Sequence, residues 1–348
     1  MTPSAELQIK FLQDLQRILE EGLFTASYKY ALLLSLADIA VERGDDSGDP
    51  LPVSLDEIAE RFIRYYWRQA RPYPRTGGGA PDVLWQNTGK QAAIVTLVSR
   101  HAHTTLADVM RDGPRWGAIR ERAKRTILDQ PLWKLQRVGD RDHDFLYEQH
   151  RLENGGIVLR PGVAFCLRRF HTLIYDLVTA AWLRFVRELR PNQSRLGQTA
   201  DLAEFLFGTE RADLACFRPI LLDIQSGRCF YCERRLTASA EVDHFIPWAR
   251  YPVDLGHNFV LADPTCNNQK RDRLAAVPHL ERWTQRNAEH RDVLAERFSE
   301  KRIVHDAATS LGVARWAYAQ ACDARALAWE RGNVLVPIPR GWASAVGL

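Results

Sequence analysis

The segment from Cys229 to Asp272 constrains this chain more than any other part of its sequence, because it concentrates residues that bind metals and transfer protons. It begins with Cys-x-x-Cys, continues with Val-Asp-His-Phe-Ile-Pro and Asn-Phe-Val-Leu, and ends with Cys-Asn-x-x-Lys. Its residue pattern favours short strands and tight turns, whereas the flanking sequence has the apolar spacing of helices. We therefore expect a small mixed module within a mainly helical protein.

Asp243, His244 and Asn267 are the residues of this segment best suited to catalysis. Asp243 and His244 are neighbours on an expected strand and face opposite ways, so they share a site only where the strand ends or bends. Pro247 supplies such a break. Asn267 lies near the start of a helix expected from Thr265 onward, and a strand end packed on a helix start brings the three side chains together. Mg²⁺ prefers the carboxylate and amide oxygens in this set, and histidine supplies a base near neutral pH.

Three of the six cysteines, Cys229, Cys232 and Cys266, fall in the same segment. The first residues of the chain, MTPSAELQIK, contain no apolar signal core. In a chain without an export signal, clustered cysteines indicate a metal site or a redox site before they indicate disulfides. No thioredoxin-like βαβ pattern surrounds the pair at 229 and 232, which weakens the redox interpretation.

The segment resembles the HNH endonucleases, whose core is the ββα-metal fold. Asp243 and His244 match the family's first Asp-His pair, Asn258 its central Asn, Asn267 its third signature position, and Lys270 the basic residue of the closing helix. The resemblance implies that Asp243 and Asn267 hold Mg²⁺ or Mn²⁺ and that His244 activates the attacking water. It also implies that Asn258 braces the loop carrying His244 and that Lys270 lies near the phosphate.

The resemblance also implies a structural zinc ion held by two ligand pairs. The first pair is Cys229 and Cys232, and the second is Asp263 and Cys266. Members of the family more often carry Cys or His where this chain has Asp263, but zinc accepts carboxylate oxygen, so a Cys₃Asp site is the expectation. His257 is the alternative fourth ligand.

Two arginine-rich stretches outside the segment are candidates for nucleic-acid binding. Residues 61–75 contain five arginines and five aromatic residues without an acid, a composition suited to phosphate contact and base stacking. The alternative is that the aromatic residues are core and the arginines line the solvent face. A second basic stretch covers 160–195. The candidate arginines are Arg64, Arg68, Arg71, Arg75, Arg168 and Arg169.

We expect a mainly α fold with one small α+β module, divided into three regions. Residues 1–200 form a helical accessory region that binds DNA or a partner protein, 210–275 the nuclease module and 276–348 a helical C-terminal extension. In that extension we expect helix to about Arg331 and an extended segment over VLVPIPRGW. Within the first region, Ser54 and Glu57 form a capping box. Asn154-Gly155 suits a hairpin turn between 145 and 159, and a long helix covers 162–189.

Composition and charge narrow the class of protein. Hydrophobic residues make up 46% and charged residues 26% of 348, which excludes collagen-like, fully disordered and disulfide-knot classes. Apolar runs are too short to cross a membrane, so we expect a cytoplasmic protein. The net charge of +4 permits a polyanionic partner.

The leading hypothesis is an HNH endonuclease acting on DNA, with RNA left open as substrate, and by analogy a restriction or phage-defence effector. The alternative is a non-catalytic protein that binds nucleic acid or a partner and keeps the scaffold for structure.

Overall fold

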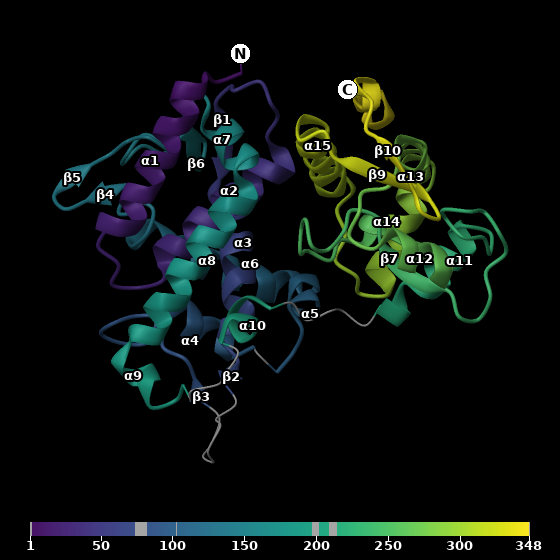
Figure 1. Cartoon of the computed structure of the whole chain (residues 1–348). Helices are drawn as coiled ribbons and strands as arrows, with labels where there is room; N and C mark the ends of the chain where they lie inside the picture. Colours follow the sequence, from purple (N-terminus) through teal and green to yellow (C-terminus); the bar gives the residue numbers. More distant parts are fainter. Residues whose placement is uncertain (1, 74–81, 102, 197–201, 209–213, 348) are drawn as a thin grey trace. The chain divides into compact units, whose positions relative to one another are not determined.

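The structure is a computed structural model that describes residues 2–73, 82–101, 103–196, 202–208 and 214–347. The chain is mostly helical, with five small two-stranded sheets among the described residues. It divides into two compact units, Met1–Gly208 and Thr209–Leu348, shown from purple to teal and from green to yellow in Figure 1. Within the described ranges, no helix has both the length and the apolarity needed to cross a membrane.

The first unit is built around helix α2 (Tyr28–Arg43), which is buried along almost its entire length. Helices α3 (Leu55–Gln69), α7 (Val163–Arg169) and α8 (His171–Glu188) pack against it (Figure 1). The unit also contains α1 (Ala5–Glu21), α4 (Ala93–Ser99), α5 (Leu106–Arg111), α6 (Gly113–Asp129), α9 (Arg190–Gln193), α10 (Leu202–Phe207), β1 (Leu51–Ser54), β2 (Pro72–Tyr73), β3 (Asp82–Val83), β4 (Arg137–Val138), β5 (Arg141–Asp142) and β6 (Gly156–Leu159).

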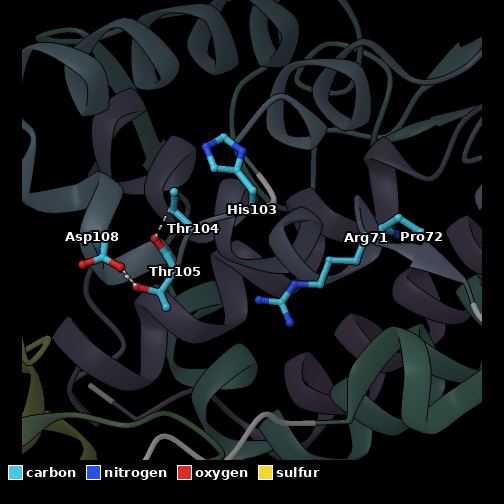
Figure 2. A pocket seen from close by; sticks show the side chains of 6 residues that line it. All are labelled: Arg71, Pro72, His103, Thr104, Thr105 and Asp108. Carbon is cyan, nitrogen blue, oxygen red and sulfur yellow. Dashed lines mark hydrogen bonds between the residues drawn. The ribbon is translucent and has the colours of Figure 1, made fainter.

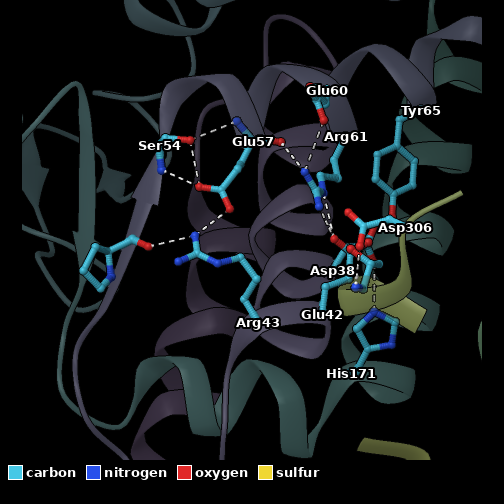
Figure 3. A network of polar contacts seen from close by, with 12 residues as sticks. Asp38, Glu42, Arg43, Ser54, Glu57, Glu60, Arg61, Tyr65, His171 and Asp306 are labelled. Atoms are coloured by element: carbon cyan, nitrogen blue, oxygen red, sulfur yellow. Dashed lines mark hydrogen bonds and ion pairs between the residues drawn. The ribbon is translucent and has the colours of Figure 1, made fainter. Parts of the chain in front are cut away.

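A buried polar network ties these helices together (Figure 3). Asp38 on α2 accepts hydrogen bonds from Tyr65 Oη at 2.6 Å and His171 Nε2 at 2.9 Å. Glu42, one turn further along α2, pairs with Arg61 Nε at 3.0 Å. Because a buried polar group without a partner costs free energy, these contacts fix how α2, α3 and α8 pack.

The expected capping box is present at the start of α3. Ser54 Oγ accepts from the Glu57 amide, and the Glu57 carboxylate accepts from the Ser54 amide at 2.9 Å. Burial opposes ionisation of Glu57, but the hydrogen bonds from Ser54 and Arg43 outweigh it and lower the pKa of the carboxyl group.

One expectation for this unit is confirmed and another needs correction. Asn154 and Gly155 do adopt the positive φ angles of a type I′ turn, 49° and 76°. Antiparallel bridges pair Glu153 with Gly156 and Tyr147 with Leu159, so the expected hairpin is present, and β6 pairs in addition with β1. The helix expected over 162–189 is divided at Phe170, where φ is −106° and ψ is 19°, into α7 and α8.

The second unit contains two antiparallel strands and a helix that follows the second strand. β7 (Glu241–His244) pairs with β8 (Phe259–Ala262), with Asp243 opposite Val260. Helix α12 (Pro264–Lys270) follows β8 after one residue. One face of the strand pair packs on α11 (Arg218–Ile224) and α14 (Arg291–Glu300), through Val242, Phe259 and Leu261.

The C-terminal residues belong to the same unit. Helices α13 (Val277–Glu289) and α15 (Ala307–Asp323) are as expected, and so is the extended conformation over Val334–Pro337, but the helical interpretation fails between Asp323 and Arg331. Instead, β9 (Leu327–Arg331) and β10 (Val334–Pro337) form a hairpin whose turn includes Gly332 at φ 54°. A final 3₁₀ segment covers Arg340–Val346. The residues of 276–348 therefore complete the packing around the strand pair.

Candidate functional site

The side chains of Asp243 and Lys270 form the buried centre of the site. The exposed fraction of Asp243 is 9% and that of Lys270 is 0%. The Asp243 carboxylate accepts a hydrogen bond from Tyr231 Oη at 2.6 Å and pairs with Lys270 Nζ at 3.0 Å. Burial and the neighbouring carboxylate raise the pKa of Tyr231, so the phenol stays protonated and donates to Asp243.

Lys270 also fixes the end of β7. Its Nζ donates to the carbonyl oxygen of His244 at 2.8 Å, so one ammonium group joins α12 to two consecutive residues of the strand. This placement corrects the expectation that Lys270 lies near a phosphate, because a fully buried ammonium group is not available to an incoming strand of nucleic acid.

The imidazole of His244 lies on the opposite face of β7 from the Asp243 carboxylate, as adjacent strand residues must. Its Nε2 is 2.8 Å from Asp254 Oδ1. The ring packs against Phe259 and Trp248, with ring centroids 4.5 and 5.1 Å away. The side chain keeps 13% of its surface exposed, so the imidazole is oriented and not sealed off.

Two asparagines fix the surrounding backbone and side chains. Asn258 accepts from the Ile246 amide at 2.8 Å and donates to the Ile246 carbonyl at 3.0 Å. It thereby holds the chain two residues beyond His244. Asn267 Nδ2 donates to Glu241 Oε2 at 2.7 Å. Because the amide donates through its nitrogen, its oxygen remains the acceptor for a further group.

The structure thus brings some of the predicted residues into contact and keeps others apart. Asp243 and Lys270 touch directly, and Asn267 contacts β7 through Glu241. His244 meets Lys270 through its backbone, while its ring binds Asp254. Within the described residues, no hydrogen bond joins the Asn267 side chain to those of Asp243 and His244.

The three cysteines Cys229, Cys232 and Cys266 lie close enough together among the described residues to hold a metal ion, with their sulfur atoms within 4.8 Å of one another. Cys229 is buried and Cys232 exposed. Burial, followed by the charge of neighbouring Cys229, raises the pKa of Cys266. Three crowded thiols of this kind suit a cation that replaces their protons.

Neither predicted fourth ligand is part of this cluster. The Asp263 carboxylate is the N-cap of α12 and accepts from the Thr265 amide at 2.9 Å, while the Asp263 amide donates to Cys229 Sγ at 3.2 Å. His257 is buried against the rings of Phe298 and His305, 5.4 and 5.8 Å away. A cleft of about 720 Å³ borders the cysteines on the side of Cys232 and Cys266.

Three residues that contact the predicted site residues were not predicted from the sequence: Tyr231, Glu241 and Asp254. Glu241 precedes Asp243 by two positions, so the two-residue period of a strand already placed both on one face. Tyr231 lies inside the Cys-x-x-Cys motif, but its sequence position carries no sign of a contact with Asp243. Asp254 lies in a loop ten residues from His244, and no periodic pattern joins them.

The arginines of the first unit that are candidates for nucleic-acid binding differ in how far they are buried. Arg168 is 3% exposed and donates to the Val41 carbonyl at 2.7 Å, so the structure corrects its assignment to a DNA surface. Arg68 binds the Phe205 and Glu204 carbonyls at 2.6 and 2.7 Å. Arg64 and Arg169 are half-buried, and Arg75 lies outside the described residues.

Arg71 lines an open hollow of about 610 Å³ together with His103 and Thr105 (Figure 2). Three of the aromatic residues between these arginines, Phe62, Tyr66 and Trp67, are core, since they are at most 5% exposed. They are therefore not available for base stacking, and the alternative interpretation of this stretch holds for them.

Comparison with known families gives two matches, one in each unit. Residues 229–276 match the HNH endonuclease family. The resemblance inferred from the sequence is therefore confirmed over this HNH segment, which points to a nuclease. A second match, over residues 8–90, is to a domain of unknown function (DUF8808) that covers α2, α3 and most of α1. No curated protein and no solved structure matches the chain.

Proposed function

We propose that this chain is a Mg²⁺-dependent endonuclease that hydrolyses phosphodiester bonds in DNA, with β7, β8 and α12 as a ββα-metal core. The observation that carries the proposal is the contact of Lys270 with both Asp243 and the His244 backbone. It fixes the helix that carries Asn267 against the strand that carries the candidate base, within the segment that matches the HNH family.

The donor atoms at the β7–α12 contact suit a hard cation. Lys270 and Tyr231 both bind Oδ2 of Asp243, which leaves the second carboxylate oxygen as a possible ligand. The oxygen of Asn267 is a second ligand of the kind that Mg²⁺ prefers. Glu241, held against Asn267, adds negative charge beside them. Asp243 and Asn267 would hold the ion, and Mn²⁺ accepts the same oxygen donors.

His244 and Asn258 then have separate roles in the reaction. His244 takes a proton from water, whose oxygen bonds to phosphorus while the bond to the 3′ oxygen breaks and that oxygen takes a proton from solvent. Asn258 keeps the backbone after His244 in place. A bound divalent cation supplies stabilisation of the charge that develops on the phosphate oxygens. The products carry 5′-phosphate and 3′-hydroxyl ends.

Cleavage assays on defined nucleic acids test this function. We expect the protein to nick supercoiled DNA when Mg²⁺ or Mn²⁺ is added and to be inactive in EDTA. Labelled single-stranded DNA and RNA assayed in parallel separate the substrates. A preference for RNA would correct the proposed substrate. Binding without cleavage under every divalent cation would favour the non-catalytic alternative. If the protein acts in phage defence, cells that express it should be protected against phage infection, and cells that express His244→Ala should lose this protection.

We also propose that Cys229, Cys232 and Cys266 hold a structural zinc ion, and a substitution series at Asp263 tests the fourth ligand. Because the Asp263 carboxylate caps α12, Asp263→Ser keeps a cap, whereas Asp263→Ala removes it and costs about 1 kcal/mol of stability. We expect both variants to retain the zinc of the unmodified protein, measured by elemental analysis.

The matched comparison is Cys266→Ser, which we expect to lose zinc, because it removes one of the three clustered sulfurs. Equal loss of zinc from both Asp263 variants would instead show that the carboxylate binds the metal, as the sequence pattern predicts.

A further inference from the structure

We infer that Asp254 is the positioning residue for His244, and this inference rests on the proposed role of His244 as the base. Asp254 Oδ1 lies 2.8 Å from Nε2 of the imidazole. An ionised carboxylate can only accept, so Nε2 must carry the proton in this contact. In the neutral ring, Nδ1 then holds the free lone pair. Asp254 thus selects the tautomer in which Nδ1 takes the proton from water.

The loop around Asp254 is anchored well enough to hold the carboxylate in place. Tyr251 and Leu255 are each 3% exposed. The ring of Tyr251 lies 6.1 Å from that of Trp316 on α15. The Gly256 amide donates to the Val304 carbonyl at 2.9 Å. The chain is therefore fixed on both sides of Asp254.

Glycine is required at position 256 for this anchoring. A Cβ atom there would lie 2.7 Å from the ring of Phe298, so only glycine lets the loop approach α14 this closely. The close approach sets the position of the backbone two residues after Asp254.

Among the described residues, Asp254 is the charged group that contacts the His244 ring. Phe259 and Trp248 pack against the imidazole. Lys270 contacts the backbone carbonyl of His244, and Asp243 points to the opposite face of the strand. When the ring accepts a proton from water, the new positive charge is shared between its nitrogens and faces the Asp254 carboxylate, which stabilises it.

Substitution of Asp254 by Asn, which keeps its size and removes its charge, tests the inference. The asparagine amide can donate to Nε2 and so favour the wrong tautomer. We expect kcat for DNA nicking to fall about 10- to 100-fold with little change in KM. Asp254→Glu should recover part of the loss, because it restores the carboxylate. Asp272→Asn is the matched control, since Asp272 is exposed in the same segment.

A spectroscopic measurement keeps the inference testable apart from the nuclease activity. In protein carrying ¹⁵N-labelled histidine, long-range ¹H–¹⁵N spectra report the tautomer, and His244→Ala assigns the signals of this ring. We expect the Nε2–H tautomer in the unmodified protein and a shift toward Nδ1–H in Asp254→Asn. Unchanged tautomer signals together with unchanged kcat would overturn the inference. If the unmodified protein cleaves nothing but the tautomer still shifts in Asp254→Asn, the proposed function is rejected and the positioning contact stands.

Discussion

Replacing His244 with alanine is expected to lower the rate of DNA nicking by about 100- to 10,000-fold, the usual contribution of a general base. The imidazole lies at the end of β7 and can accept a proton from water, and its Nε2 is bound to Asp254. Removal of the ring leaves the Asp243–Lys270 pair in place, so the folded structure should survive. Initial rates on supercoiled DNA in Mg²⁺, with thermal unfolding of both proteins, measure the effect.

Two further measurements make this result specific to the base. His103→Ala is the control, because His103 is an exposed histidine of the first unit, and its activity should match that of the unmodified protein. Imidazole added to His244→Ala should restore part of the rate if only the proton acceptor is missing. Equal rates for His244→Ala and the unmodified protein would remove His244 from the reaction and leave the HNH match without its proposed chemistry.

The sequence was informative where spacing alone decides which residues meet. The Cys-x-x-Cys pair and Cys266 do cluster, because the ends of a short turn and the start of a short helix are close in any compact module of this size. The capping box at Ser54 is equally local, since its hydrogen bonds join residues three positions apart. The strand period likewise separates the side chains of Asp243 and His244.

Contacts that depend on which side chains are buried could not be predicted from the sequence. A lysine after an Asn in a nuclease motif suggests a phosphate ligand, yet Lys270 is the buried partner of Asp243. Arg168 similarly resembles a surface cation in sequence but reaches the end of α2, at the Val41 carbonyl. Long side chains can point either way from a helix, and the rest of the fold decides which. The contact of Asp254 with His244 was likewise unpredictable, because a loop has no regular residue spacing from which to infer its contacts.

Replacing Lys270 with methionine tests the buried pair directly. Methionine fills similar space but removes one of the two donors that the described residues offer to the Asp243 carboxylate, the other being Tyr231. Breaking a buried ion pair from one side typically costs 3–5 kcal/mol, so about that loss is expected in the free energy of unfolding of the second unit. Urea unfolding followed by hydrogen exchange in peptides from residues 229–276 measures it locally.

The double variant Asp243→Asn with Lys270→Met separates the lost charge pairing from the lost packing. It removes both charges, so its destabilisation should fall short of the sum of the two single effects by about 1 kcal/mol or more. Lys301→Met is the control at an exposed lysine of the same unit and should change stability by no more than about 0.5 kcal/mol. The contrary result is a Lys270→Met protein that is as stable as this control and binds DNA more weakly and with less dependence on salt. That result would show that the ammonium group contacts phosphate, because only an exposed lysine can release counterions from nucleic acid.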